Sequence, residues 1–150
     1  FLKMDLSKID VDACVAAWPT LEQEQQRALE IFKDFPVPQL GYTEITKKYN
    51  DAETVRQQLT KVKENWTELK ERIQNQVYTY DKMVALMKSV GAPVGPESIG
   101  LTRAQVRRMV DFVQLMRWRI NLFDLCKRAQ IYDALLDRVF GKGGVLEISE

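Results

Sequence analysis

The side chains that most often carry out enzymatic chemistry are sparse in this chain of 150 residues, which contains no histidine. Without an imidazole, the chain cannot form a Ser-His-Asp triad, a Cys-His nucleophile pair or an HExxH zinc site. Carboxylates do occur in close pairs, at Asp10/Asp12, Glu22/Glu24 and Asp133/Asp137. On helices such pairs usually lie in solvent or complement the helix dipole, so we assign no catalytic residue in this chain.

Metal and cofactor sites are also not indicated by the residue types and their spacing. Cys14 and Cys126 are far apart in the sequence, and two cysteines without histidine cannot complete a tetrahedral zinc site. We expect both to be reduced, buried thiols, with a disulfide as the alternative. The glycines at 91, 95 and 100 have the wrong spacing for a phosphate-binding loop. We therefore assign no metal ligand and no cofactor-binding residue here.

The formal net charge of +1 gives no general attraction to nucleic acid or to an anionic membrane. Residues 101–140 carry eight basic and four acidic side chains, which we interpret as a solvated helix face. The segment "RRMVDFVQLMRWR" mixes basic and aromatic residues, but its Val and Met positions follow a helical period typical of a core helix. No apolar run approaches the ~20 residues of a membrane span, and no signal peptide is visible. We expect a cytoplasmic protein without a nucleic-acid partner.

Proline and glycine cluster at the joints between segments, and residues 42–90 and 101–140 contain neither. Both types are unfavourable inside helices, so these long stretches predict helices. Capping-box spacings at Thr20/Gln23, Asn50/Glu53 and Thr102/Gln105 mark three helix starts. The sequence predicts one all-α domain over residues 1–150, a bundle of about six helices with short Gly/Pro-rich connections. The tail at 142–150 is expected to be loose or to pair as a short strand.

Three apolar stripes are expected to form buried helix faces. The first has the 4-3-4-3-4 spacing of a coiled-coil seam, which we expect to pack within the chain, with a dimeric coiled coil as the alternative. Methionines in the other two stripes are interpreted as core filler. Trp118 is expected to pack and Arg119 to pair with Asp124. The three stripes are Val55, Leu59, Val62, Trp66, Leu69 and Ile73; then Tyr80, Met83, Val84, Met87 and Val90; then Val106, Met109, Val110, Val113 and Met116.

Between the second and third stripes lies the segment "GAPVGPESIGLT", residues 91–102, called the elbow below. Gly91 is placed to end one helix in the left-handed conformation, with Pro93 just beyond it. Thr102 is placed to cap the next helix. These features predict a rigid reversal of the chain between two helices.

The stretch "KMVALMKSVGAPVGPESIGLTRAQVRRMV", followed by "RWRINLFDL", resembles the C-terminal region of sn-glycerol-1-phosphate dehydrogenases. This family belongs to the superfamily of iron-containing alcohol dehydrogenases and dehydroquinate synthases. The resemblance covers residues 80–126, whereas the preceding residues agree only in helical character. The matching features are Gly91-Ala92-Pro93, Pro96-Glu97-Ser98-Ile99-Gly100-Leu101, Thr102, Arg117 with Arg119, and Leu122–Leu125.

The resemblance implies a two-domain parent enzyme that takes part in phospholipid metabolism. An N-terminal α/β domain of such an enzyme binds NAD(P), and a helical domain helps to hold a divalent metal, zinc, nickel or iron, through one aspartate and two histidines. Because this chain has no histidine, neither histidine ligand can be placed in it. We expect Phe1 to begin downstream of those ligands, so that the chain is the distal part of the helical domain and the upstream cofactor-binding domain is absent.

The expected function is therefore that of a structural C-terminal piece, catalytically silent alone, of an enzyme that interconverts dihydroxyacetone phosphate and glycerol 1-phosphate. Its expected partner is the rest of the parent enzyme, and a homodimer remains open. The alternative is a free-standing helical interaction module that uses the 55–73 seam or the basic 101–140 segment.

Overall fold

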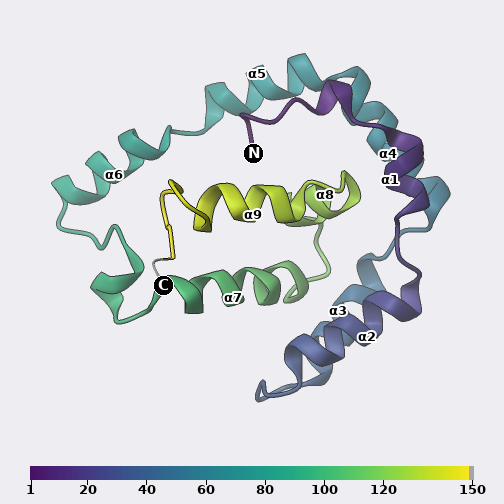
Figure 1. The fold of residues 1–150 in the computed structure, drawn as a ribbon, viewed down its shortest axis with the longest axis horizontal. Helices are drawn as coiled ribbons and strands as arrows, with labels where there is room; N and C mark the ends of the chain where they lie inside the picture. Colours follow the sequence, from purple (N-terminus) through teal and green to yellow (C-terminus); the bar gives the residue numbers. More distant parts are fainter. Residues whose placement is uncertain (149–150) are drawn as a thin grey trace.

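Helices dominate the computed structural model, which describes residues 1–148, and the expected all-α class is confirmed (Figure 1). The long stretches without proline and glycine are helical, whereas the joints rich in these residues are turns. In chain order the elements are η1 (Leu6–Lys8), α1 (Val11–Ala16), α2 (Leu21–Phe32), α3 (Gln39–Lys48), α4 (Ala52–Glu64), α5 (Trp66–Gln76), α6 (Tyr80–Ser89), η2 (Pro96–Ile99), α7 (Arg103–Leu115), α8 (Leu122–Arg128) and α9 (Tyr132–Phe140), where η marks a short 3-10 helix.

The helices are arranged as an arc around a central pair (Figure 1). Helices α4, α5 and α6 form the arc, while η1 and α1 run along its inner side and pack against α4. The central pair is α7 and α9, which lie side by side, and α2 and α3 form a hairpin that packs against α7. Helix α7 therefore contacts both the hairpin and the C-terminal helices.

The chain divides into more helices than the sequence predicts, and the clearest reason is a break at Asn65. This residue leaves the helical conformation at φ −106° and ψ 14°, and its side-chain Nδ2 donates to the Lys61 carbonyl at 2.8 Å. The 55–73 seam is thus divided between α4 and α5. Val55, Leu59 and Trp66 are buried within the chain's own fold, which confirms the expected internal packing for this part of the seam.

Most predicted helix starts are confirmed by side-chain caps. Thr20 and Thr102 form complete capping boxes with Gln23 and Gln105. The predicted cap at Asn50 is wrong: Asp51 caps α4 by accepting from the Thr54 backbone N–H at 2.8 Å. The Asn50 side chain instead hydrogen-bonds to another helix, as described below.

The C-terminal residues 142–148 form turns and no strand, contrary to the strand alternative, and Ser149 and Glu150 lie outside the described residues. The tail folds back on α9, because Leu146 and Ile148 donate their N–H groups to Val139 and Phe140 at 2.9 Å. Leu146 packs against the apolar cluster of α8 and α9.

Cys14 and Cys126 are free and buried, as expected, and they lie in two different apolar clusters. Burial disfavours the charged thiolate and raises the pKa of Cys126 to about 11. Both residues behave as small apolar side chains in the core.

A buried ion pair lies where α3, α7 and α8 meet. Lys48 Nζ on α3 is 2.8 Å from Asp124 Oδ1 on α8, and the two side chains are only 2% and 5% exposed. Asp124 also accepts from Gln114 Nε2 at 2.6 Å and from the Asn121 backbone N–H at 2.8 Å. Lys48 Nζ donates to the Gln114 carbonyl as well. The predicted Arg119–Asp124 pair is therefore wrong, because Asp124 points into the protein and Lys48 neutralises it.

The polar network extends from this pair to α2. Gln114 Oε1 accepts from Arg27 Nη2 at 2.7 Å, and Arg27 also forms two hydrogen bonds with the buried Glu24, at 2.9 and 3.0 Å. Lys48, Gln114, Asp124, Arg27 and Glu24 thus link four helices through charged and amide groups that are satisfied mainly by one another.

Arg128 is also buried, and it links α8 to α4 and to Asn50, which lies just before α4. Its Nη1 donates to Gln58 Oε1 at 2.5 Å and its Nη2 to Asn50 Oδ1 at 2.9 Å. Its Nε has no hydrogen-bond partner among the described residues. Asn50 is therefore an acceptor for a buried arginine, and this use explains why Asp51 caps α4.

Replacing Asp124 by Ala leaves the Lys48 ammonium buried without its counter-charge, and we expect a loss of about 3–5 kcal/mol in the free energy of unfolding. Urea denaturation followed by circular dichroism measures this. The double variant Lys48→Met/Asp124→Leu should recover part of the loss, since it removes both charges.

The matched control is Glu30→Ala, which breaks the exposed Lys33–Glu30 pair and should leave the urea midpoint almost unchanged. An Asp124→Ala variant as stable as this control would contradict the buried ion pair.

Candidate functional site

The carboxylate pairs do not come together into one site. Asp10 caps α1, while Asp12 pairs with Arg56 of α4. Glu24 is buried against Arg27, whereas Glu22 is exposed. Within residues 1–148, no cluster of three or more His, Cys, Asp or Glu side chains could hold a metal ion.

The elbow folds as the sequence predicts and is stabilised by local hydrogen bonds. Gly91 adopts φ 68°, and the N–H groups of Gly91 and Ala92 donate to the carbonyls of Lys88 and Met87, the pattern of a Schellman motif. After η2, Gly100 adopts φ 77° and the Leu101 N–H donates to the Pro96 carbonyl at 3.0 Å. Two left-handed glycines thus reverse the chain between α6 and α7.

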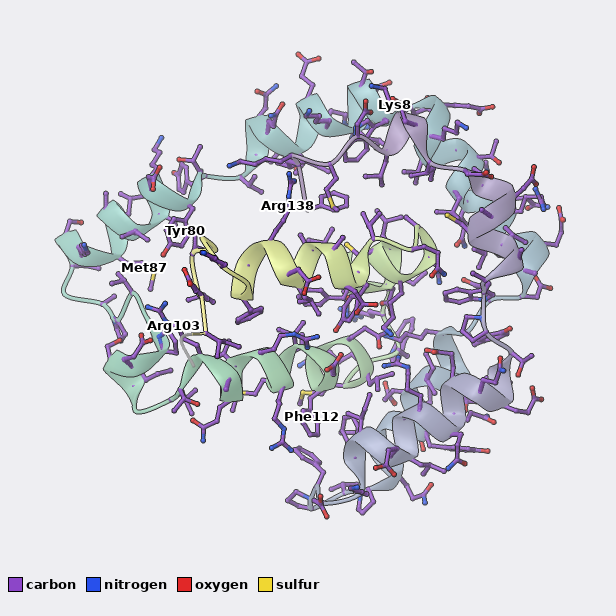
Figure 2. The ribbon with its side chains drawn as sticks, viewed as in Figure 1. Lys8, Tyr80, Met87, Arg103, Phe112 and Arg138 are labelled. Carbon is purple, nitrogen blue, oxygen red and sulfur yellow. The ribbon has the colours of Figure 1, made fainter. Side chains whose placement is uncertain are left out.

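Arg103 connects the elbow to the C-terminal tail (Figure 2). Its Nε donates to Glu97 Oε1 at 2.7 Å, and its Nη1 donates to the Glu147 carbonyl at 2.9 Å. The first turn of α7, η2 and the tail are therefore connected by a single guanidinium. This basic residue of the 101–140 segment has a structural partner on each side.

Helix α6 does not form the buried face that its stripe predicts. None of its residues is buried, and Val90 at its end is 78% exposed. Figure 2 places Tyr80 and Met87 on the side of α6 that faces the tail and η2, yet Tyr80 remains 53% exposed. The apolar side of α6 therefore has little protein packed on it within the described residues.

The buried face of α7 also differs from the prediction. Gln114 and Leu115 are buried, and Phe112 points toward the α2–α3 hairpin, where its ring is 4.9 Å from that of Phe32 (Figure 2). On another face, Met109, Val113 and Met116 are spaced four and three residues apart and are all exposed. Val106 and Val110 pack on the apolar cluster of α8 and α9, so the uncovered apolar residues of α7 are these three.

The interpretation of the methionines as core filler is therefore wrong for Met83, Met109 and Met116, which are exposed, and Met87 is only half-buried. The sequence does contain a signal that α7 carries more apolar residues than its core contacts need. Phe112 and Leu115 fall outside the stripe that begins at Val106, so apolar residues cover more of the helix than one buried face requires.

The exposed apolar side chains are concentrated in the segment of the chain around the elbow. Soluble monomers expose single apolar side chains, whereas larger apolar areas mark contact sites. We name the exposed large apolar residues of 80–126 the elbow surface, and treat it as a candidate interaction surface. It comprises Tyr80, Met83, Leu86, Val90, Ile99, Met109, Val113, Met116, Trp118, Ile120 and Leu122.

An apolar cavity of about 790 Å³ borders this segment. Its walls come from the N-terminal residues, the end of α5 and the start of α6, and include Phe1, Ile73, Val77 and Tyr80. The 3-residue link between α5 and α6 also carries the exposed Val77 and Tyr78. Unfilled apolar space thus lies beside the least covered helix.

None of the helices in the described part of the chain is long and apolar enough to cross a membrane. Comparison with family models, curated proteins and solved structures finds no match for this chain.

Replacing Gly100 by Ala should lower the free energy of unfolding by about 1–2 kcal/mol. No atom lies within 4 Å of the added Cβ, so the whole effect comes from the positive φ. Thermal or urea unfolding measures the loss. Gly95→Ala is the matched control in the same elbow, because Gly95 has φ −140° and its Cβ would meet only the end of the flexible Glu97 side chain. Equal losses in the two variants would argue against the left-handed turn.

Proposed function

We propose that this chain is the distal helical part of an sn-glycerol-1-phosphate dehydrogenase, which reduces dihydroxyacetone phosphate to glycerol 1-phosphate with NAD(P)H. The role of the chain in that enzyme is structural: it completes the helical domain and forms one wall of the active-site cleft. A contribution to a subunit interface is part of the same proposal.

The residues of this chain do not fit the metal and cofactor of the family. The chain contains no histidine and no phosphate-binding glycine loop. The catalytic groups of the proposed enzyme therefore come from a part of the protein outside this sequence, and the chain alone is catalytically silent.

One observation carries the proposal: eleven of the sixteen exposed large apolar residues of the described chain lie in the segment that resembles the family, 80–126. If the chain worked alone, these apolar side chains would remain in water at a free-energy cost of roughly 25 cal/mol per Å². If the chain is part of a larger enzyme, the rest of that enzyme covers them. The elbow has two left-handed glycines and the Thr102 cap, which is compatible with the turn and capped helix on which the resemblance to the family rests.

Parts of the surfaces that a free-standing interaction module would use are already engaged within the chain. In the 55–73 seam, Val55 and Leu59 pack with Cys14 of α1. In the basic segment, Arg103 is bound by Glu97 and Arg107 by Asp111, while Arg128 is buried. These contacts make the seam and the basic segment less suited to a partner than the elbow surface, and we put forward no second function.

The test is to assay the complete gene product that contains this sequence. With dihydroxyacetone phosphate, NAD(P)H and a divalent metal, we expect cofactor oxidation and a product of sn-glycerol 1-phosphate configuration, determined with a stereospecific enzyme. The isolated 150-residue chain should be inactive under the same conditions. Activity of the isolated chain, or an inactive complete protein, would refute the proposal.

A matched pair of substitutions tests the covering of the elbow surface. Val113→Lys should leave the stability of the isolated chain within about 0.5 kcal/mol, because the side chain is exposed there. In the complete enzyme it places a charge in an apolar contact, and we expect at least a tenfold loss of activity or assembly, measured by steady-state kinetics and size-exclusion chromatography. Gln57→Lys, at an exposed site on α4, is the control and should retain both the activity and the assembly of the complete enzyme.

A further inference from the structure

The connection between α7 and α8 has the sequence Met-Arg-Trp-Arg-Ile at residues 116–120 (Figure 1). All five residues are exposed, and Trp118 and Ile120 reach 55% and 54%. We name this stretch the Trp118 loop. It is a part of the elbow surface in which three apolar side chains alternate with two arginines, so apolar and basic groups lie side by side in solvent.

The backbone of the Trp118 loop is fixed by the helices around it. The Trp118 N–H donates to Glu44 Oε2 on α3 at 2.7 Å. Just after the loop, the capping box of Asn121 and Asp124 begins α8, and Asp124 is itself held by the buried Lys48. The loop is therefore pre-organised, and a partner that binds it does not have to order a mobile segment, which is a large cost of association.

The two arginines of the loop have no counter-charge among the described residues. Neither Arg117 nor Arg119 forms a hydrogen bond or an ion pair within 1–148, and Glu44, whose carboxylate reaches the loop backbone, forms its ion pair with Lys47. The guanidinium carbon of Arg119 lies 5.7 Å from the centre of the Trp118 ring. This cation–π contact orients the guanidinium and leaves its N–H groups free to donate to an anion.

The chemistry of the loop favours a protein partner that carries carboxylates. Tryptophan, methionine and arginine are enriched at protein interfaces, and tryptophan and arginine often dominate the binding energy. A guanidinium matches the two oxygens of a carboxylate, and complementary charge selects the partner. Single-stranded nucleic acid is bound by stacking and phosphate contacts, to which exposed aliphatic residues such as Val113 and Ile120 contribute little.

We propose that the Trp118 loop binds an acidic segment of the rest of the enzyme, in which an apolar side chain packs on Trp118 and carboxylates pair with Arg117 and Arg119. Because the partner segment belongs to the same complete protein, the inference rests on the proposed function. It adds the chemistry of the segment that covers this end of the elbow surface. The exposed Val113 and Met116, three residues apart, continue the apolar contact from the loop onto α7.

The first experiment measures how accessible the loop arginines are in the complete gene product. Phenylglyoxal modifies exposed arginines, and peptide mass spectrometry gives the rate at each position. We expect Arg117 and Arg119 to react on the order of tenfold more slowly than Arg72, because a docked segment excludes solvent from its central contacts. Arg72 on α5 is the matched comparison, since its side chain is 67% exposed and its ion pair with Glu68 is long, at 3.7 Å. Equal rates at the three arginines would overturn the proposal.

The second experiment identifies the partner carboxylate. Arg119→Lys keeps the charge and supplies an amine that a carbodiimide couples to a carboxylate in contact with it. In the complete protein we expect a cross-link from position 119 to an aspartate or glutamate outside the 150 residues of this sequence, located by mass spectrometry. The exposed Lys61 on α4 is the control and should form no such cross-link. Cross-links from position 119 only to carboxylates within this sequence, or none at all, would overturn the proposal.

These readouts separate the acidic partner from the dehydrogenase activity. A complete protein that is inactive on dihydroxyacetone phosphate but gives the cross-link refutes the proposed function and supports the acidic partner. An active enzyme with reactive loop arginines and no cross-link refutes the acidic partner alone. Co-sedimentation of the complete protein with phosphatidylglycerol vesicles, lost in the double variant Arg117→Gln/Arg119→Gln, would assign the loop to a membrane surface and overturn the proposal.

Discussion

The ion pair between Lys48 and Asp124 is the constraint on which the arrangement of the C-terminal helices depends. Two charges removed from water are stabilised only when their geometry is good and their remaining hydrogen-bonding positions are filled. Here Gln114, the Asn121 backbone and the Gln114 carbonyl fill those positions. The pair therefore forms only when α3, α7 and α8 are in place together. An alternative packing that separates these helices would leave at least one buried charge without a partner.

The rotation of α7 about its axis follows from this network. Because Gln114 must reach both Asp124 and Arg27, it faces inward, and Leu115 beside it is buried with it. On a helix with 3.6 residues per turn, Met109, Val113 and Met116 then lie on a different face. These three residues of the predicted core stripe thus become surface, while Val106 and Val110 of the same stripe pack against the apolar cluster of α8 and α9. A polar interaction in the interior decides which apolar residues remain available for a partner.

Features that depend on a few neighbouring residues could be predicted from the sequence, whereas those that join distant segments could not. The Thr102 capping box and the left-handed Gly91 use contacts within a few residues, and both were predictable. The site of the α4 cap was not, because Asn50 is occupied by Arg128, which lies in a distant part of the chain. The buried Lys48–Asp124 pair also joins residues far apart in the chain, and no motif in the sequence marks it.

The residues at left-handed positions indicate how stability is distributed over this fold. Gly91, Gly100 and Gly143 occupy three such positions, and each has open space where a Cβ would lie. These turns only reverse the chain, and glycine is the least strained residue for that purpose. Gln130 is the exception among the described residues, and there the N–H groups of Gln130 and Ile131 donate to Lys127 and Cys126, the same pattern as at Gly91. At that turn the end of α8 is closed at the expense of backbone strain, whereas Gly91 closes the end of α6 without it.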